Sequence, residues 1–391
     1  MGRYDFTTVV DRRDSGSLKW NPSYLEKLCG NPHALPFWVA DMDFRSPPEV
    51  IEALHSRIDH GIFGYLSSAE ELFHAFCSWA RMRFSWDVSA DAVCWTPGIV
   101  TALAASVQAY TEPGDGVIIQ TPAYRPFFSV IRDNQRKVLE NPLIYRDGRF
   151  SLDLDHLEEL MKSASLMLFC SPHNPSGRVW SRQDLTEISR MSRKHGVMVV
   201  SDEIHADMTY PGYTHFPWNS IDEQGITCMA PSKTFNIAGE HVSCIVIPDE
   251  GQRNSFTSLL SRLSLGSPTV LSYTAARAAY QYGGPWLDEL IDLLVRHARL
   301  TGSYLSSHAP EIRMVMPEAS FIAFLDCSTL LERIGRSRDL VNILGTRGGI
   351  ALHRGSWFGS AGKDFVRINF GTPESLLEQG LSKLARAVGE L

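Results

Sequence analysis

Two charged residues follow apolar runs in the stretch SDEIHADMTYPGYTHFPWNSIDEQGITCMAPSKT, which covers residues 201–234. Asp202 stands after the run 197–200, and Lys233 stands after the run 226–230, 31 positions later. Taken singly, the aspartate could cap a helix and the lysine could be an ordinary surface charge. A lysine that follows a buried segment can also be a nucleophile for an aldehyde, and an aspartate there can balance a buried positive charge.

The elements that must position these residues are short strands and longer helices in alternation. Apolar runs flanked by turn residues predict buried strands at 92–95, 117–119, 166–170, 197–200, 226–230 and 244–247. Segments of helical period lie between several of them, at 99–110, 155–163 and 181–195, the last with Ser181 as a candidate N-cap. This alternation predicts an α/β fold whose mainly parallel, mixed sheet is covered by helices on both faces.

Polar groups follow five of these predicted strands in succession. They are the turn and helix start Gly98-Ile99-Val100, then Tyr124, Asn174, Asp202 and Lys233. Each has an ordinary role when taken alone, such as loop packing for Tyr124 or a turn for Asn174. In an open α/β sheet, however, a ligand binds beyond the carboxyl ends of the strands. The joint placement therefore predicts one site with a helix N-terminus, an aromatic ring, an amide, a carboxylate and an amine.

One cofactor, pyridoxal 5'-phosphate, uses all five of these groups. Its phosphate suits the amides of a helix N-terminus, its ring can be covered by an aromatic side chain, and its phenolic oxygen can bond to an amide. Its pyridine nitrogen needs a carboxylate to stay protonated, and its aldehyde forms a Schiff base with a lysine. We therefore expect Asp202 to hold the pyridine nitrogen and Lys233 to carry the cofactor.

The chain of 391 residues is too long for a single core of typical size. From about residue 285 the pattern changes to a long amphipathic stretch at 286–306, strand candidates at 321–326 and 365–370, and a final helix from residue 373. We expect a large cofactor-binding domain at 46–285 and a smaller α/β domain at 286–391. The N-terminal segment 1–45 is expected to contribute to the smaller domain.

Composition and charge narrow the classes of function. Hydrophobic residues make up 44% and charged residues 21%, as in globular proteins, and a net charge of -7 argues against nucleic acid as a partner. The start MGRYDFTTVVDRRDSGS lacks the apolar core of a secretory signal, and no run of about 18 apolar residues predicts a membrane span. Seven scattered cysteines favour buried thiols over disulfides or zinc. We expect a cytoplasmic protein without a metal.

The sequence resembles fold-type I pyridoxal phosphate enzymes of the class I/II aminotransferase superfamily. Within that superfamily it is most similar to the cystathionine β-lyase, or cysteine carbon–sulfur lyase, branch. The phrases that carry the resemblance cover nearly the whole chain: VVDRR (9–13), WVADMDF (38–44), HGIFGY (60–65), TPGIVTAL (96–103), TPAYRPFF (121–128), SPHNPSGRVW (171–180), SDEIHADM (201–208), APSKTFNIAG (230–239), GSPTVLSYTA (266–275), PWLDEL (285–290) and FVRINFG (365–371). The DEIH and SKTFNIAG phrases point to the lyase branch.

The resemblance implies a role for each matching residue. Lys233 would be the Schiff-base lysine and proton carrier, and Asp202 and Tyr124 would act with it in catalysis. The remaining cofactor contacts would come from Asn174 and His205 at the phenolic oxygen, and from Ile99, Val100 and Ser232 at the phosphate. Tyr65 would reach the phosphate of a neighbouring subunit, so the resemblance implies a homodimer with shared sites. Arg367 would bind the substrate carboxylate, with Asn174 and the backbone of Ala40 nearby.

Two positions depart from the pattern of many aminotransferases. His241, preceded by Glu240, stands eight positions after Lys233, where many relatives have an arginine that binds the phosphate. His205 stands where a tyrosine is common. Both departures are also found in the lyase branch.

The resemblance implies α,β-elimination from cystathionine or another cysteine S-conjugate, giving a thiol, pyruvate and ammonia. The physiological setting could be general breakdown of sulfur amino acids or the assembly of a sulfur-containing natural product. Two alternatives stay open: an aminotransferase of class I/II, and a non-catalytic regulator that reuses the fold.

Overall fold

The computed structural model describes residues 2–391, and its largest sheet has seven strands. In spatial order these are β2 (Val93–Thr96), β10 (Ser243–Val246), β9 (Ile226–Met229), β8 (Met198–Asp202), β7 (Ala164–Cys170), β3 (Gly116–Thr121) and β4 (Lys137–Pro142). β10 runs antiparallel to both of its neighbours, whereas the other neighbouring pairs are parallel. The predicted mixed, mainly parallel sheet is confirmed, and the carboxyl ends of its parallel strands reach one edge.

Helices cover both faces of this sheet, because alternate strand residues point to opposite sides. Val117 and Ile119 of β3 pack in one cluster with α4 (Ile99–Tyr110), α5 (Arg125–Arg132) and α10 (Glu250–Arg262). Ile118, between them, packs on the other face with α6 (Leu154–Met161), α7 (Arg182–His195) and α8 (Trp218–Ile221). The apolar runs of the sequence are therefore buried on both sides, as predicted for parallel strands.

The helix boundaries follow local capping signals. The backbone N–H of Asp184 donates to Ser181 Oγ (3.1 Å), and the Asp184 carboxylate accepts from the backbone N–H of Ser181 (2.9 Å). This reciprocal pair satisfies two amides at the start of α7, so the predicted N-cap is confirmed. The structure also confirms the helix predicted at 99–110, which is α4. The helix predicted at 155–163 is α6, which begins one residue earlier and ends two residues earlier than predicted.

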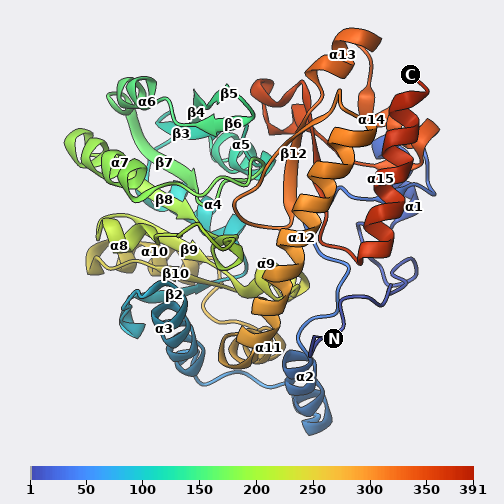
Figure 1. Cartoon of the computed structure of the whole chain (residues 1–391). Helices are drawn as coiled ribbons and strands as arrows, with labels where there is room; N and C mark the ends of the chain where they lie inside the picture. Colours follow the sequence, from blue (N-terminus) through green and yellow to red (C-terminus); the bar gives the residue numbers. More distant parts are fainter. Residues whose placement is uncertain (1) are drawn as a thin grey trace.

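A second sheet of four antiparallel strands is formed by the C-terminal part of the chain. Its order is β11 (Arg313–Val315), β12 (Ile322–Asp326), β15 (Phe365–Asn369) and β14 (His353–Arg354). Figure 1 shows the green to yellow strands of the larger sheet on one side and the orange to red elements, including β12 and α15 (Glu374–Gly389), on the other. α12 (Gly284–His308), α13 (Ser328–Ile334) and α14 (Leu340–Ile343) belong to the same C-terminal part.

The N-terminal part of the chain runs beside this second sheet. β1 (Leu35–Pro36) pairs in parallel with β13 (Ile350–Ala351). This pairing agrees with the expected place of the N-terminal segment, while the domain boundaries 1–45, 46–285 and 286–391 stay a prediction. The remaining helices are α1 (Pro22–Cys29), α2 (Pro48–His60), α3 (Glu70–Phe84), α9 (Pro231–Thr234) and α11 (Val270–Tyr282), and a small hairpin is formed by β5 (Ile144–Arg146) and β6 (Arg149–Ser151).

The predictions about membrane spans, cysteines and metal sites can be compared with the structure of residues 2–391. Within that range no helix is long and apolar enough to cross a bilayer. All seven cysteines are free thiols, and six of them are buried. The same range holds no group of three or more histidine, cysteine or carboxylate side chains that could bind a metal ion.

Candidate active site

A cavity of about 320 Å³ lies where the carboxyl ends of the parallel strands meet α4 and α9. Nine of the eleven residues predicted for the site line it: Ala40, Ile99, Val100, Tyr124, Asn174, Asp202, His205, Ser232 and Lys233. Arg367 lies behind Asn174 and donates from Nη1 to its Oδ1 (3.0 Å). Tyr65 is fully exposed and is not part of the cavity lining. The structure thus brings ten of the eleven residues together within one chain.

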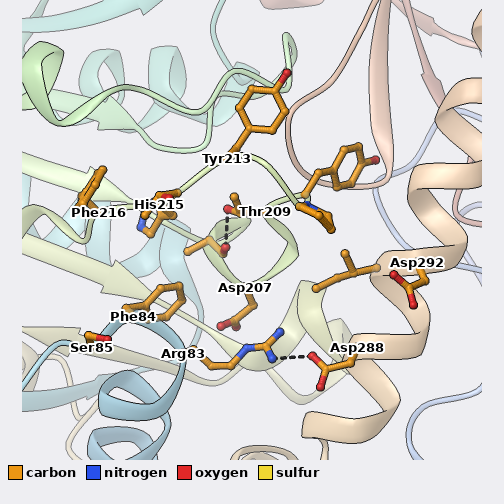
Figure 2. A pocket seen from close by; sticks show the side chains of 15 residues that line it. Arg83, Phe84, Ser85, Asp207, Thr209, Tyr213, His215, Phe216, Asp288 and Asp292 are labelled. Atoms are coloured by element: carbon orange, nitrogen blue, oxygen red, sulfur yellow. Dashed lines mark hydrogen bonds and ion pairs between the residues drawn. The ribbon is translucent and has the colours of Figure 1, made fainter.

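A second cavity, of about 500 Å³, is lined by charged groups that are mostly paired. Arg83 donates to Asp288 (2.6 Å), as Figure 2 shows. His215 Nε2 lies 2.7 Å from Glu203, and Asp207 accepts hydrogen bonds from Trp79 and Thr234, each at 2.8 Å. Because Thr234 is next to Lys233, its bond to Asp207 helps to hold α9 in place.

Lys233 lies in α9, partly buried, at the floor of the smaller cavity. Its Nζ donates to the backbone oxygen of Ala40 (2.5 Å). Burial lowers the pKa of Lys233 to about 8, with Arg367 acting in the same direction and the charges of Asp41 and Asp202 opposing it. A substantial fraction of the amine is therefore neutral and nucleophilic near neutral pH.

Asp202 is the last residue of β8, and its carboxylate is buried. Oδ1 accepts from the backbone N–H of Ile204 (3.1 Å), while Oδ2 accepts no hydrogen bond from residues 2–391. Burial raises the pKa of Asp202 to about 7, because little in the protein stabilises its charge. A cationic N–H donor in the cavity would supply the missing partner and keep the carboxylate ionised.

His205 is held by a residue that the sequence did not single out. Ser320 Oγ lies 3.0 Å from His205 Nδ1, which leaves the other ring nitrogen toward the cavity. Burial, together with the nearby charges of Lys233 and Arg367, lowers the pKa of His205 to about 3, so the imidazole is neutral. No local pattern marks Ser320, because its contact with His205 spans 115 positions.

The backbone of Ser320 adopts a conformation that is unusual for a residue with a side chain. Its φ is +76°, in the left-handed region that favours glycine. Its N–H donates to the backbone oxygen of Met208 (2.9 Å), and its carbonyl accepts from the hydroxyl of Tyr210 (2.5 Å). These bonds hold the strained residue so that its hydroxyl meets His205.

Arg367 is a buried cation, 2% exposed, without a carboxylate partner within 4 Å among residues 2–391. Its Nη groups donate to Asn174 Oδ1 (3.0 Å) and to the backbone oxygen of Trp38 (2.8 Å), while Nε has no partner in the described chain. Burial lowers the pKa of Arg367 to about 10. An unpaired buried guanidinium beside a cavity is suited to bind an anionic group of a ligand.

The N-terminus of α4 forms the opposite end of the cavity. Gly98 precedes the helix with φ +93°, and no side chain caps the first amides of α4. Ser232 and His241 line the cavity beside these amides, and the backbone of His241 is also left-handed (φ +47°). A helix N-terminus with a hydroxyl and an imidazole beside it suits a phosphate group.

Comparison with known proteins places the chain in a family. Residues 34–384 match the model of the class I and II aminotransferases, so the chain belongs to that family. It is 42% identical to cystathionine beta-lyase PatB of Bacillus subtilis over 98% of this chain and 100% of that protein. It is 33% identical to the protein MalY of Escherichia coli, over 98% and 99% of the two chains.

The fold is that of fold-type I pyridoxal phosphate enzymes, as predicted. The solved structure of cystalysin from Treponema denticola, which contains pyridoxal 5'-phosphate, superposes with a TM-score of 0.93. It is 36% identical to this chain, and the match covers 99% of each.

The residues present around the cavity fit pyridoxal phosphate. The uncapped amides of α4 suit its phosphate, and the Asp202 Oδ2 atom without a donor suits its protonated pyridine nitrogen. Lys233 presents an amine whose pKa is lowered to about 8 by burial, which suits reaction with an aldehyde. Each end of the cofactor therefore has a chemical counterpart in the chain.

The lowered pKa of Lys233 gives a first testable prediction. In the cofactor-free protein, the rate of pyridoxal phosphate capture should rise with pH through about 8 and level off above it, because the neutral amine reacts. An ordinary lysine side chain, with a pKa of about 10.4, would give a rate that still rises well beyond pH 9. The measurement is stopped-flow absorbance, with Nα-acetyl-lysine as the control for titration of the cofactor itself. A rate that keeps rising past about pH 10 would contradict a buried, low-pKa amine.

The strained contact of Ser320 gives a second prediction. Ser320→Ala removes the hydroxyl and keeps the left-handed backbone, so it should lower the free energy of unfolding by about 1–3 kcal/mol. Ser320→Gly loses the same hydroxyl but relieves the strain, and we expect it to be about 1 kcal/mol more stable than the alanine variant. Urea unfolding of the cofactor-free variants at one fixed protein concentration measures both. An alanine variant more stable than the glycine variant would argue against strain at this position.

Proposed function

We propose that the chain is a pyridoxal-phosphate-dependent carbon–sulfur β-lyase that cleaves cystathionine or another cysteine S-conjugate to a thiol, pyruvate and ammonia. The observation that carries this proposal is the low-pKa amine of Lys233 in a cavity between Asp202 and the unpaired guanidinium of Arg367. A relative of the same length, 42% identical, is a cystathionine β-lyase, which supports the same reaction here.

The cofactor is held by groups at every side of the cavity in this proposal. The amides of Ile99 and Val100 and the hydroxyl of Ser232 would bind the phosphate, and Asp202 would keep the proton on the pyridine nitrogen. Tyr124 would contact the cofactor ring, and Asn174 and His205 would bond to its phenolic oxygen. Asn174 has its Nδ2 group free for this bond, because Oδ1 accepts from Arg367. His241 lies beside the phosphate site, where a permanent cation is absent from the cavity lining.

The substrate amino acid is bound through its α-carboxylate. The guanidinium plane of Arg367 is set by its bonds to Asn174 and Trp38, and each Nη group keeps a second N–H with which it can donate to a carboxylate. The carboxylate would also neutralise a cation that is otherwise buried without a counter-charge. The backbone of Ala40 lies beside the amine of Lys233 and closes this side of the site.

The elimination depends on a group that can take a proton from Cα and later give one to the thiolate. Bound pyridoxal phosphate supplies an electron sink for the pair left on Cα when its proton leaves. Lys233, as a neutral amine, would remove that proton, and Asp202 would keep the sink positively charged. The Cβ–S bond breaks, the thiolate takes up a proton from the Lys233 ammonium, and water converts the remaining fragment into pyruvate and ammonia. One substrate and one water therefore give three products, with no oxidant or reductant.

Two subunits are required for a complete site in this proposal. Tyr65 is predicted to reach the phosphate of a neighbouring subunit, and it stands fully exposed at the end of a segment with other exposed apolar residues, Ile58, Ile62 and Phe63. This segment begins in the last turn of α2 and continues beyond it, and α2 projects from the body of the molecule in Figure 1. Exposed apolar side chains in one segment are typical of an interface. We therefore propose a homodimer, and a cytoplasmic location in keeping with seven free thiols.

The reaction type can be tested directly by its products. Purified protein given a cysteine thioether should release thiol, pyruvate and ammonia in equal amounts, with no keto acid added. The aminotransferase alternative predicts a different result, in which the cofactor ends as pyridoxamine phosphate and the thioether survives in a keto acid. Product analysis by mass spectrometry and the cofactor spectrum separate the two. Lys233→Ala is the matched control and should abolish turnover, whereas the alternative of a non-catalytic regulator predicts no turnover even in the wild type.

The shared site predicts complementation between two defective variants. Lys233→Ala has an intact Tyr65, and Tyr65→Ala has an intact Lys233. If a site combines Lys233 of one subunit with Tyr65 of its partner, each mixed dimer regains one complete site. Random reassembly of equal amounts should then restore about a quarter of wild-type activity at limiting cofactor. A mixture that stays at the level of the separate variants would show that each site uses its own tyrosine or none.

A further inference from the structure

Four charged side chains near the N-terminus form a buried cluster that the proposed reaction does not use. Arg12 Nη2 lies 2.6 Å from Asp41, and its Nη1 lies 2.8 Å from Asp43. Lys19 Nζ lies 2.7 Å from Asp43 and 3.9 Å from Asp41. We call these four residues, Arg12, Lys19, Asp41 and Asp43, the arm cluster. They join the otherwise irregular segment 2–21 to the segment 38–44.

Lys19 and Asp43 form the deeply buried half of the arm cluster, whereas the side chains of Arg12 and Asp41 are 20% and 21% exposed. Lys19 is 1% exposed and Asp43 is 3% exposed. Burial works to raise the pKa of Asp43, but the charge and hydrogen bond of Lys19 and the indole N–H of Trp20 (2.9 Å) lower it below its usual value. Burial also opposes the charge of Arg12, but hydrogen bonds and charges from Asp41 and Asp43 raise its pKa. Burying a single charge costs free energy, and a buried ion pair usually adds little to the stability of the fold. Stability alone therefore does not explain the arm cluster.

The cations of the cluster also bind backbone oxygens of the segment 38–44. Lys19 Nζ donates to the oxygen of Asp41 (3.1 Å), and Arg12 Nη1 donates to the oxygen of Met42 (3.1 Å). In return, Trp38 Nε1 donates to the backbone oxygen of Lys19 (3.0 Å). The arm and the segment therefore hold each other through both side chains and backbone.

The same segment contacts two residues of the active site. The oxygen of Trp38 accepts from Arg367 (2.8 Å), and the oxygen of Ala40 accepts from Lys233 (2.5 Å). On the side of the protein core, Asn369 Nδ2 donates to the oxygens of Val39 and Asp41, each at 2.6 Å. The segment thus lies between the arm cluster and the site, and its carbonyl groups face both.

We propose that the arm cluster is a positioning device for the active site. Arg12 and Lys19 fix the segment 38–44 so that its carbonyl groups hold the amine of Lys233 and the plane of Arg367. This inference rests on the proposed roles of Lys233 and Arg367. It assigns a function to the phrase VVDRR and, beyond the contact of Ala40 with Lys233, to the phrase WVADMDF.

Asp41 adds an electrostatic effect to this geometric one. The charged groups that face Lys233 are Asp41 from the segment, Arg367 from β15 and Asp202 from β8, while His205 beside it is neutral. Asp41 stabilises the ammonium form of Lys233, and Arg12 holds the Asp41 carboxylate in place. Asp41→Asn should therefore move the pH profile of cofactor capture by the cofactor-free protein to lower pH.

Two neighbouring arginines give a matched experiment. Arg12 belongs to the cluster, whereas Arg13 forms an exposed pair with Asp11 (2.5 Å) and does not contact the segment 38–44. In Arg12→Gln and in Lys19→Met, we expect faster hydrogen–deuterium exchange in residues 38–44 of the cofactor-free protein. In the loaded enzyme, we expect KM for the thioether to rise about tenfold, because Arg367 is no longer held in one plane. Arg13→Gln should match the wild type in both measurements within about twofold.

A double variant keeps the test valid if single changes unfold the protein. Lys19→Met with Asp43→Leu replaces the buried ion pair by apolar groups of similar size, which commonly preserves stability. It should still show faster exchange at 38–44 and a raised KM. Wild-type exchange and wild-type KM in folded Arg12→Gln and in the double variant would overturn the proposal. Altered exchange and an altered pH profile of cofactor capture in a protein that produces no thiol would support the positioning role and overturn only the lyase reaction.

Discussion

The arrangement of this molecule depends on three charged groups that are buried around one cavity without pairing to each other. Lys233, Asp202 and Arg367 come from α9, β8 and β15, and no ion pair within 4 Å joins any two of them in the described chain. Burial lowers the pKa of Lys233 and Arg367 and raises that of Asp202. Each group is therefore left poorly stabilised until a ligand supplies a compensating charge or reacts with it.

The fold keeps these three charged groups apart and brings all of them to the same cavity. The parallel strands of the larger sheet end at one edge, so Asp202 at the end of β8 and Lys233 in α9, just after the neighbouring strand β9, both reach the cavity. Arg367 comes from the second sheet, and its hydrogen bond to Asn174 joins the two sheets at the site. A site built between two sheets can change shape when they move relative to each other, which makes the contacts that cross between them important for its geometry.

Several of those contacts are carried by backbone atoms or by strained residues. The segment 38–44 holds Lys233 and Arg367 through carbonyl groups, and Ser320 meets His205 from a left-handed backbone. Such contacts need neighbours that fix the backbone, and the structure supplies them through the arm cluster and through Tyr210. The chemistry of the site and the packing around it are therefore parts of one network.

The sequence by itself determined the strand and helix pattern and most of the site. The apolar runs and the residues that follow successive strands predicted Ile99, Val100, Tyr124, Asn174, Asp202 and Lys233, because parallel strands bring their carboxyl ends together whatever lies between them. The resemblance to the enzyme family added Ala40, His205, Ser232 and Arg367. The tertiary structure alone decided the place of Ser320 and the arm cluster, whose contacts join residues up to 115 and 31 positions apart. No local periodicity encodes such contacts, since they depend on how the two sheets pack. Tyr65 is exposed and lies outside the cavity of the single chain, so its part in the site stays a prediction.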